Sequence, residues 1–383
     1  METPEFDIVI SGAGPVGSAL ALLLARTARV PERIALLERS PTSQATPVAA
    51  DPRTLAMNHG SRMLLEPLGA WPAQSAEITT VHVSQRGRLG RTLITHEELG
   101  VPRLGSVVAY PALQQSMLQA LTQSGVSLLE AGREEPGAHK SQWRTADGRP
   151  IDGRLRVRSD GSPPGGIQRS YDQYAVLTSI EAGRPRAGWA YERFTRQGPL
   201  AILPHPAGGA RYALVWCCAP ERATLLLQLD DTQFARELQD AFGDRLGSLE
   251  PVGERHVFPL ALNAGPLLLD SRTVAVGNAA QTLHPVAGQG LNLGLRDAAQ
   301  LAQALSGWLN HPTSDPAPLL QKFTRRRRPD RWITSALTDF LPRVFATGNP
   351  LVEHGCGLSL LALDSCRALR TPLARHLLEG LRT

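Results

Sequence analysis

The residues with the clearest chemical purpose in this sequence are three glycines near its beginning. Gly12, Gly14 and Gly17 follow a short apolar run and precede a helical pattern, which gives the order strand, turn, helix. The first glycine permits a tight turn, the second lets a ligand approach the backbone, and the third lets the helix pack closely on the strand. Because the free N–H groups of such a helix bind phosphate oxygens, the spacing predicts a dinucleotide site.

A carboxylate stands where the ribose of that dinucleotide is expected. A second apolar run, residues 34–37, leads to Glu38, which lies 21 residues beyond Gly17. The usual spacing is about 20 residues, and an acidic residue here favours an unphosphorylated ribose, as in FAD or NAD. The residues of this region expected to bind the cofactor are Gly12, Gly14, Pro15, Val16, Gly17, Glu38 and Arg39.

A second segment rich in glycine lies far along the chain, at residues 273–297. An apolar strand runs into a loop, and a helix is expected to begin near Gly290 and to reach Leu309. The backbone N–H groups of such a loop and the N-terminus of its helix would face one side of a ligand. The residues of this segment expected to bind the cofactor are Gly277, Asn278, Pro285, Gly288, Gly290, Leu291 and Asn292.

Residues 277–297 resemble the second flavin-binding motif of the para-hydroxybenzoate-hydroxylase-like, or class A, flavoprotein monooxygenases. The resemblance includes residues 51–56, where Arg53 matches an arginine that lies beside the cofactor in that family, and the pair Asp160-Gly161. The stretches that are most similar to the ubiquinone-biosynthesis branch of the family are residues 78–87, 191–204, 214–217, 236–247 and 277–285.

This resemblance implies an α/β protein with a Rossmann-like FAD-binding domain, a β-sheet substrate domain and C-terminal helices. FAD would be bound, NAD(P)H would bind transiently, and O2 would hydroxylate a polyprenylated phenol, with 2-octaprenyl-6-methoxyphenol as the expected substrate. Other ubiquinone-biosynthesis proteins are possible partners. The boundaries expected are 1–77, 109–166 and 263–310 for the FAD-binding domain, 78–108 and 167–262 for the substrate domain, and 311–383 for the helical region.

The sequence departs from the family pattern in two places. The family usually has aspartate where this chain has Asn278, whose amide still offers a hydrogen-bond acceptor. Before Asp160, arginines alternate with Leu155 and Val157, which suggests a strand with one exposed face. That alternation bears on the packing beneath the cofactor and on the strength of FAD binding.

His284 is the candidate catalytic residue, because it lies beside Pro285 in the expected flavin loop. It would act as an acid, a base or a substrate contact, and the alternative is that it braces the loop. The sequence has no Ser/His/Asp or paired-carboxylate arrangement that demands another mechanism. Its four cysteines show no metal-ligand spacing, so no metal site is expected.

Two other functions without a tightly bound flavin remain open at this point, besides a flavin enzyme of the same fold with another reaction, such as an epoxidase, halogenase or reductase. An NAD-dependent dehydrogenase would explain the residues from Gly12 to Gly17 and Glu38, but it leaves residues 277–297 without a purpose. A flavin-poor assembly component of a ubiquinone-biosynthesis complex would explain the altered segment before Asp160. A tightly bound yellow cofactor would argue against both.

The sequence predicts a cytoplasmic protein with free thiols, because no secretory signal is visible and no apolar run approaches the ~20 residues that span a bilayer. The formal charge is +5 and the pI is about 9.3, and these values alone do not indicate a nucleic acid as a partner. The C-terminal stretch joins a basic cluster, residues 325–328, to Leu358, Leu360, Leu361 and Leu363. We therefore expect peripheral membrane contact there. The alternatives are an oligomer interface or packing in the core.

Overall fold

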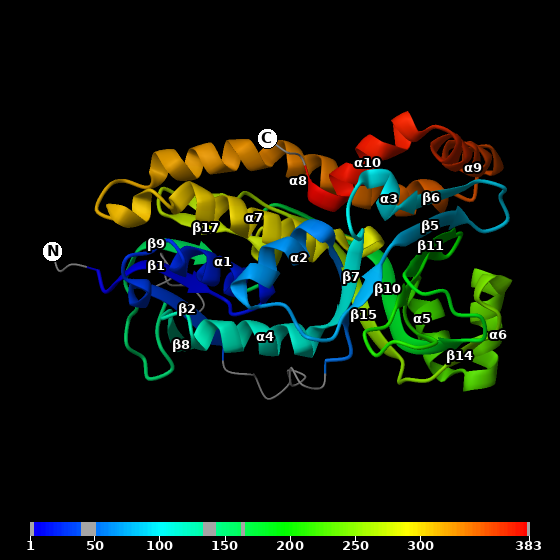
Figure 1. Ribbon diagram of the computed structural model, residues 1–383, viewed down its shortest axis with the longest axis horizontal. Coiled ribbons are helices and arrows are strands. Elements are labelled where there is room, and N and C mark those ends of the chain that lie inside the picture. The colour runs from blue at the N-terminus through cyan, green and yellow to red at the C-terminus, as the bar shows by residue number, and fades with distance from the viewer. Residues whose placement is uncertain (1–3, 40–50, 133–142, 162–164, 381–383) are drawn as a thin grey trace.

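The computed structural model describes residues 4–39, 51–132, 143–161 and 165–380. One sheet and its helices occupy the N-terminal side of the elongated molecule, and a larger sheet occupies the opposite end (Figure 1). The last three helices lie together along one side of both (Figure 1). The arrangement is the mixed α/β architecture with C-terminal helices that the sequence predicts.

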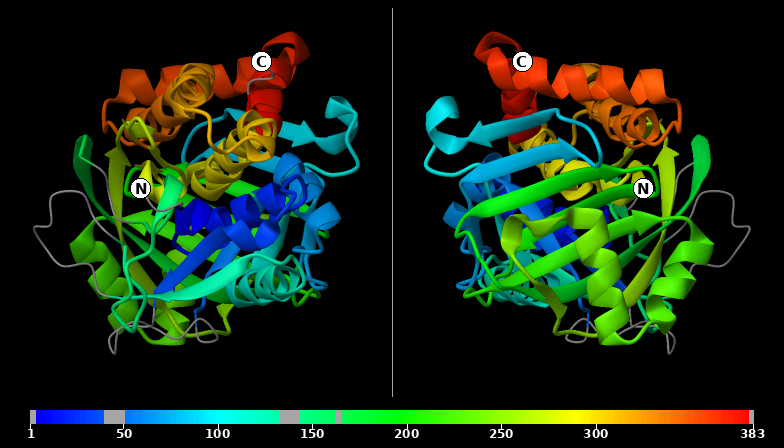
Figure 2. Two further views of the ribbon diagram at one scale, coloured as in Figure 1. Left: turned by 90° about the vertical axis from the view of Figure 1, so that its left-hand side faces the viewer. Right: turned by 90° about the vertical axis from the view of Figure 1, so that its right-hand side faces the viewer.

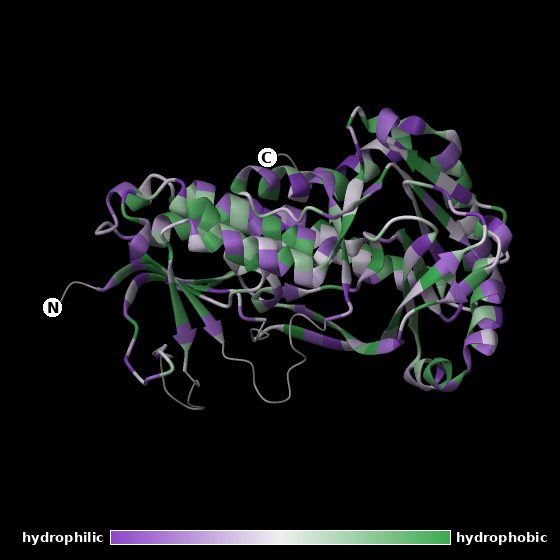
Figure 3. Ribbon diagram, turned by 60° about the horizontal axis from the view of Figure 1, so that its bottom comes forward, coloured by the Kyte–Doolittle hydropathy of each residue, from purple (hydrophilic) through white to green (hydrophobic). Residues whose placement is uncertain are grey.

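The first sheet has six strands in the order β16-β17-β9-β1-β2-β8. The pairs from β17 to β8 are parallel, and β16 is antiparallel to β17. Parallel strands read as apolar runs where both faces are buried, as along β1, and strands of this sheet appear mostly green in Figure 3. The strands are β1 (Phe6–Ser11), β2 (Ile34–Arg39), β8 (Ser127–Ala131), β9 (Gly153–Arg158), β16 (Leu268–Asp270) and β17 (Thr273–Ala275).

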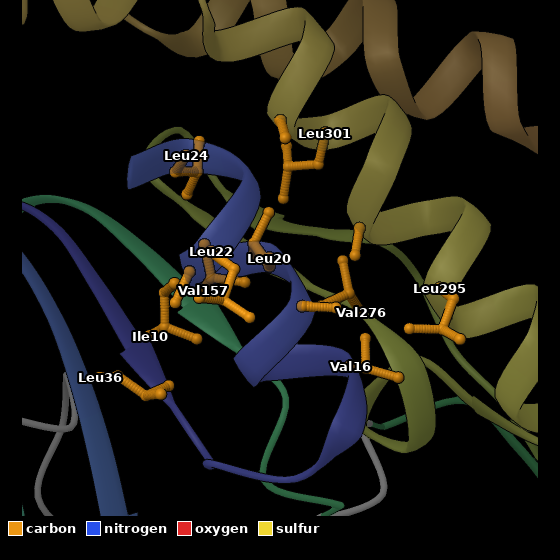
Figure 4. Close-up of a cluster of buried hydrophobic side chains, with 14 of the residues drawn as sticks. Ile10, Val16, Leu20, Leu22, Leu24, Leu36, Val157, Val276, Leu295 and Leu301 are labelled. Atoms are coloured by element: carbon orange, nitrogen blue, oxygen red, sulfur yellow. The ribbon is translucent and has the colours of Figure 1, made fainter. Parts of the chain in front are cut away.

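Three helices cover one face of this sheet and form the main core with it. They are α1 (Pro15–Ala25), α4 (Tyr110–Thr122) and α7 (Gln289–Leu305). Figure 4 shows side chains of α1 and α7 packed over those of β1, β2 and β9. Helix α7 starts one residue before the expected position and ends at Leu305, and a short turn, Trp308–Asn310, follows it.

Strand β9 carries the predicted alternation. Leu155 and Val157 are fully buried in the main core, whereas Arg154, Arg156 and Arg158 are only partly buried. The prediction of a one-sided strand is confirmed. The outer face is neutralised in part, since the guanidinium of Arg154 lies 3.2 Å from the carboxylate of Asp7.

The second sheet has nine strands: eight follow the order β18-β15-β10-β13-β12-β11-β5-β6, and the ninth, β14, pairs with β10 beside this path. Helices α5 (Pro220–Gln228) and α6 (Asp231–Phe242) cover one face, where Leu200, Trp216 and Phe234 are fully buried. The strands are β5 (Thr80–Gln85), β6 (Arg91–Thr95), β10 (Ile167–Ala182), β11 (Trp189–Thr195), β12 (Gly198–Pro204), β13 (Arg211–Cys218), β14 (Leu249–Pro251), β15 (His256–Ala264) and β18 (Gln281–Thr282).

A small third sheet of order β3-β7-β4 connects the two larger ones. It consists of β3 (Thr54–Asn58), β4 (Ala76–Ile78) and β7 (Gly105–Ala109), with helices α2 (His59–Leu65) and α3 (His96–Leu99) nearby. The remaining 3-10 turns are η1 (Pro31–Arg33), η3 (Glu66–Leu68), η4 (Asp244–Leu246), η5 (Gly277–Ala279), η6 (Val286–Gly288) and η7 (Trp308–Asn310). The division into domains by residue number stays a prediction.

The C-terminal region contains α8 (Ala317–Phe345), α9 (Pro350–Ser365) and α10 (Arg367–Glu379). These helices form a layer over the rest of the molecule in both side views (Figure 2). Along α8 the buried residues recur every three or four positions, as expected for a helix with one face on a core. They are Leu320, Phe323, Arg327, Asp330, Thr334, Thr338, Pro342 and Phe345.

Candidate functional site

The N-terminal turn is shaped by glycines that have no room for a side chain. A Cβ added to Gly12, whose φ is +105°, would lie 2.6 Å from the Cα of Asp160. A Cβ on Gly17 would lie 2.0 Å from the carbonyl oxygen of Gly12. By contrast, a Cβ on Gly14 would meet nothing within 4 Å. The first and third glycines therefore serve the fold, and the second leaves open space in front of α1.

The N-terminus of α1 is suited to an anion. No side chain caps this helix, and no acidic residue lies in its first turn, so the positive end of its dipole faces the open space at Gly14. Glu38 is exposed at the end of β2, directly after Leu37, whose carbonyl accepts a 2.9 Å hydrogen bond from Gly12. This order places a carboxylate beside the turn. The side chain of Arg39 lies outside the described residues.

Not every residue expected to bind the cofactor turns its side chain to that space. Val16 is buried between α1 and α7, and a Cβ on Gly294 would lie 2.7 Å from its Cγ2. A Cβ on Gly277 would lie 3.1 Å from the Cβ of Val16. The side chain of Val16 therefore holds the two glycine-rich segments together, and its contact with a cofactor would be through the backbone.

The second turn presents a matching open space at the N-terminus of α7. Gly288 adopts a left-handed conformation there, no side chain caps the helix, and its first turn has no acidic residue. A Cβ on Gly290 would meet nothing within 4 Å, as at Gly14. Asn278 is exposed although Val276 and Ala279 beside it are buried. An exposed amide in a buried loop is free to contact a ligand.

Asn292 has a structural task. Its Oδ1 accepts hydrogen bonds from the backbone N–H of Asn58, at 2.9 Å, and from the hydroxyl of Ser61, at 2.7 Å. Its Nδ2 donates to the carbonyls of Ala56, at 3.0 Å, and Gly288, at 2.6 Å. Because all four bonds are within the protein, the side chain fixes the turn, and cofactor binding by this residue would be through its backbone.

His284 is fully buried in the loop that leads to α7. Its Nε2 lies 3.0 Å from Oε1 of Gln173, and its Nδ1 accepts a 3.4 Å hydrogen bond from the backbone N–H of Val286. Burial lowers the pKa of His284 to about 4, so the ring is neutral near pH 7. This geometry favours the loop-bracing interpretation over a role as acid or base.

The partner of His284 comes from a distortion in β10 that the sequence did not reveal. The pairing of β10 with β15 shifts between Ser170 and Tyr174, and Asp172 has a φ of 48° in this bulge. The ring of Tyr171 meets that of His284 edge to face at 5.1 Å. No feature of the sequence predicts the bulge. Tyr171, Asp172 and Gln173 neither break an alternating pattern of apolar residues nor form a turn motif.

A buried polar network connects the flavin-motif loop to α8. The side chain of Gln281 donates to Asp297 at 2.8 Å, and the guanidinium of Arg327 lies 2.5 Å from the other oxygen of Asp297. Arg331 of α8 also donates to Gln281. Burial alone would lower the pKa of Arg327, but the carboxylates of Asp297 and Asp330 outweigh it and raise that pKa. One arginine of the predicted basic cluster, residues 325–328, is therefore internal.

Arg53 connects the cofactor region to the large sheet. It pairs with Asp51 at 2.6 Å, and its guanidinium lies 4.5 Å from the centre of the Tyr110 ring and 5.9 Å from that of Phe258. The hydrogen bond with Asp51 raises the pKa of Arg53, and burial raises the pKa of Tyr110. This corner therefore joins β3, α4 and β15 around one permanent positive charge.

The face of the large sheet opposite α5 and α6 turns toward this corner. Phe194 of that face clusters with Val286 of the loop before α7, and Phe258 contacts Arg53. The pairing register puts Leu177, Val215 and Ala201 in one row across the sheet. All three are only partly buried, unlike the fully packed residues on the other face. A partly open apolar face is suited to an apolar ring.

The described ranges contain neither a metal-ligand cluster nor a membrane-spanning helix. No group of three or more metal-ligating side chains was found among residues 4–39, 51–132, 143–161 and 165–380. Within the same ranges, no helix is long and apolar enough to cross a membrane.

Comparison with known proteins places this geometry among flavoproteins. The model of the FAD binding domain family matches residues 168–336. Ubiquinone hydroxylase UbiL of Rhodospirillum rubrum is 31% identical, over 98% of this chain and 90% of that protein. The 3-demethoxyubiquinol 3-hydroxylase of Escherichia coli is 28% identical, over 99% of this chain and 100% of that protein.

Solved structures with this fold are more distant in sequence. PqsL of Pseudomonas aeruginosa, described as a probable FAD-dependent monooxygenase, has a TM-score of 0.70 at 20% identity, over 92% of this chain and 99% of PqsL. The p-nitrophenol 4-monooxygenase PnpA of Pseudomonas putida has a TM-score of 0.73 at 15% identity, with both chains covered completely (100%). At these identities the likeness shows the fold.

Proposed function

Because the chain belongs to the FAD-dependent monooxygenase family that includes the ubiquinone hydroxylases, we propose that it hydroxylates the ring of a polyprenylated phenol in ubiquinone biosynthesis. The names of its relatives point to more than one hydroxylation step, including that of 3-demethoxyubiquinol. We propose 2-octaprenyl-6-methoxyphenol as its substrate, because five stretches of the sequence resemble the branch that acts on it.

One observation carries the proposal: two open turns, more than two hundred residues apart in sequence, are held together. Gly277 and Gly294 pack directly against Val16, which brings the N-terminus of α1 beside η5 and the second turn of α7. Gly14 and Gly290 leave space in front of both helices. A single NAD-binding turn would need only the first of these. The pair fits a flavin cofactor whose phosphates and ring are bound at different helix ends.

The residues proposed to hold FAD are those of the two turns. The backbone N–H groups at the start of α1 would bind the pyrophosphate, and Glu38 the ribose. Asn278 and the N-terminus of α7 would bind the remainder of the cofactor. When bound, FAD supplies the oxygen chemistry, with reducing equivalents from NAD(P)H and oxygen from O2, as in the rest of the family.

The chain itself would position the phenol and exclude water. The half-buried face around Leu177, Ala201 and Val215 offers apolar contacts to the ring and the start of the prenyl tail. Arg53, which is paired with Asp51, places its guanidinium at the same corner, where its remaining N–H groups would stabilise negative charge that develops on the reacting groups. His284 stays neutral and holds the loop, so no proton is assigned to it.

The prenyl tail of the proposed substrate has a consequence for location. Such a tail partitions into lipid, so we propose that the protein contacts the cytoplasmic face of a membrane through its C-terminal helices. Other ubiquinone-biosynthesis proteins are proposed partners on the same ground. The positions expected for this contact need one revision, because Leu360 is buried in a core cluster while Leu358 and Leu361 are exposed.

The first test is the visible spectrum of purified protein, before and after dialysis and the addition of FAD. The flavin-loaded protein is then given NADH or NADPH, isotopically labelled dioxygen and one of two phenols, 2-octaprenyl-6-methoxyphenol or 3-demethoxyubiquinol. A product with one labelled oxygen atom is expected from the first phenol. Labelling of the second phenol alone would reassign the step, and a protein that never retains flavin would favour the assembly role.

A variant of the proposed substrate face sharpens the test. Ala201→Phe fills the row between Leu177 and Val215, so it is expected to raise KM or lower turnover by about tenfold or more while FAD affinity is unchanged. Ala187→Phe adds the same ring at an exposed position and serves as the matched control. Equal losses of FAD and turnover in Ala201→Phe would contradict this placement of the substrate.

A further inference from the structure

We propose that the outer faces of α8, α9 and α10, together with the tip of the β5–β6 hairpin, dock on a bilayer that contains anionic lipid. This inference rests on the membrane contact proposed above and assigns it a surface and a lipid chemistry. We call these outer faces and the hairpin tip the docking face. Its residues lie outside the two turns and the substrate face.

Helix α8 has a buried inner face and an exposed outer face. Its inner face packs on α7 and carries the buried network of Arg327 and Asp330. Its outer face exposes Trp332 by 61%, Ile333 by 42% and Phe340 by 57%. Trp332 and Phe340 lie eight residues apart, about two helical turns, so they share one side of the helix. Large apolar and aromatic side chains on the outside of an amphipathic helix are typical of helices that lie in a membrane interface.

The same character continues onto the next two helices. Leu351, Leu358 and Leu361 of α9 are exposed by 82%, 66% and 46%, and Leu369 of α10 by 59%. Sixteen large apolar side chains are exposed in the described ranges, and seven of them lie on these three helices. Figures 1 and 2 show the helices as one layer on the same side of the molecule. The exposed apolar residues therefore gather instead of being scattered singly, as on most surfaces.

The exposed charged residues of these helices are all cationic. Residues 317–379 contain ten lysines and arginines and five acidic residues, so they account for the whole formal charge of the chain, +5. None of those five acidic residues is in the exposed class. The exposed cationic residues are Lys322, Arg325, Arg326, Arg328, Arg343, Arg367 and Arg375, of which Arg343 pairs with Asp339 and Arg367 with Glu98. An anionic lipid surface complements this distribution.

The hairpin between β5 and β6 extends the docking face. Leu89 is 99% exposed at its tip, between Arg88 and Arg91. Arg88 pairs with Glu353 of α9 at 2.5 Å, and a Cβ on Gly90 would lie 1.7 Å from the carbonyl oxygen of Gly357. The tip is therefore fixed against α9, and its leucine, close to the exposed Arg91, has the character of a residue that enters the headgroup region.

A second copy of the chain fits this face less well than a bilayer. In a twofold dimer the same patch meets itself, so the exposed arginines of one copy would approach those of the other. Long arginine side chains can instead extend to lipid headgroups while the apolar residues between them are buried. The charge pattern thus selects an anionic membrane, and the dimer becomes an outcome of the test.

The test uses the full chain loaded with FAD and two kinds of vesicle. One is pure phosphatidylcholine, and the other contains equal parts of phosphatidylcholine and phosphatidylglycerol. Cosedimentation at low and high salt is expected to show binding to the anionic vesicles that weakens with salt. The double variant Trp332→Ser, Phe340→Ser is expected to bind at least tenfold more weakly. Arg325→Gln with Arg328→Gln is expected to lose about tenfold and much of the salt dependence.

The matched control replaces exposed leucines elsewhere. Leu118→Ser with Leu225→Ser removes side chains exposed by 50% and 44% on α4 and α5, and vesicle binding is expected to be unchanged. FAD content and turnover of phenol delivered in detergent are measured in every variant and are expected to match the parent protein. Binding without any hydroxylation would refute the proposed function and leave the docking face intact.

Two results would overturn the docking face itself. One is a parent protein that stays in the supernatant with anionic vesicles at low salt. The other is a Trp332→Ser, Phe340→Ser variant that binds as tightly as the parent. If light scattering also shows that this variant changes a dimer into a monomer, the face is an interface between two copies.

Discussion

The two turns that face the proposed cofactor are held in different ways. The turn before α1 is fixed by backbone packing, since Gly12 and Gly17 touch main-chain atoms where any Cβ would clash. The turn before α7 is fixed by side-chain hydrogen bonds, from Asn292 to four backbone or hydroxyl groups and from His284 to Gln173. Similar openings at Gly14 and Gly290 are thus built by steric exclusion in one case and by polar bracing in the other.

This difference predicts different responses to mutation. The turn before α1, which we call the steric turn, cannot accommodate added atoms, because its neighbours are backbone atoms that cannot rotate away. The turn before α7, which we call the braced turn, accommodates added atoms. It does not tolerate the loss of a hydrogen-bond partner, because buried donors and acceptors are then unsatisfied. Substitutions at the two turns should therefore differ clearly in the size and in the kind of their effects.

The largest effect is expected at the steric turn. Gly17→Val places side-chain atoms in the position of the Gly12 carbonyl, so α1 must move away from β1. We expect complete loss of retained FAD, measured by flavin absorbance after desalting. Gly307→Val is the control, since a Cβ there meets nothing within 4 Å. Full flavin content in Gly17→Val would show that this turn can relax, and the comparison would fail.

The braced turn should lose stability first. Asn292→Leu removes four hydrogen bonds and leaves the buried N–H of Asn58 unsatisfied, which should lower the free energy of unfolding of the flavin-free protein by about 2–4 kcal/mol. Asn278→Leu, at an exposed position, should stay within about 0.5 kcal/mol. Chemical denaturation of both variants without flavin measures this. Similar stabilities would mean that Asn292 is not a brace.

The protonation of His284 should make stability depend on pH. Its pKa is lowered from 6.5 to about 4 by burial, so between these values the unfolded chain binds the proton and the folded chain does not. The free energy of unfolding should therefore fall as the pH drops through this window, by up to about 3 kcal/mol. His82, whose pKa is also lowered to about 4, contributes in the same direction.

The test compares denaturation curves of His284→Gln, His82→Gln and the double variant across that window. Each single variant should flatten the pH dependence, and the double variant should flatten it further. Turnover at neutral pH provides a second measurement. If His284→Gln lowers turnover by more than a hundredfold at full FAD occupancy, the histidine has a catalytic role and the bracing assignment is wrong.

The smallest effect is expected where the two openings are alike. Gly290→Ala should raise the stability of the flavin-free protein by about 0.5–1 kcal/mol, because alanine favours the helix and meets no neighbour. Its methyl group would enter the space assigned to FAD, so FAD affinity should fall. Isothermal titration with FAD should therefore show weaker binding, whereas denaturation without FAD should show higher stability. Gly14→Ala should likewise lower FAD affinity, and unchanged affinity in both would move the cofactor elsewhere.

The steric turn was predictable from the sequence, and the braced turn was predictable only in part. The spacing of Gly12, Gly14 and Gly17 identifies a packing arrangement that involves near neighbours, so the residue types alone carry the information. The alternation around Leu155 and Val157 belongs to the same class, and the structure confirms it. Patterns with a short period report on local geometry directly.

The bracing contacts connect residues that are distant in sequence and have no shared pattern. Gln173 lies 111 residues from its partner His284, and Asn58 lies 234 residues from Asn292. Nothing in either residue's neighbourhood shows that it will be paired, because the pairing depends on how the sheets meet. The same reason explains why Arg327, in a run of four arginines, is buried while Arg325 and Arg328 are exposed.

The contact between Val16 and α7 has a consequence for the order in which the chain becomes competent. Strand β1 needs β9 beside it, α1 needs Gly277 and Gly294, and Asp297 of α7 needs Arg327 of α8. During synthesis, the turn before α1 emerges well before the segments that support it. If the two turns bind flavin as proposed, a nascent chain lacks the complete site until α8 has left the ribosome. Flavin capture would then report that translation has passed the end of this helix.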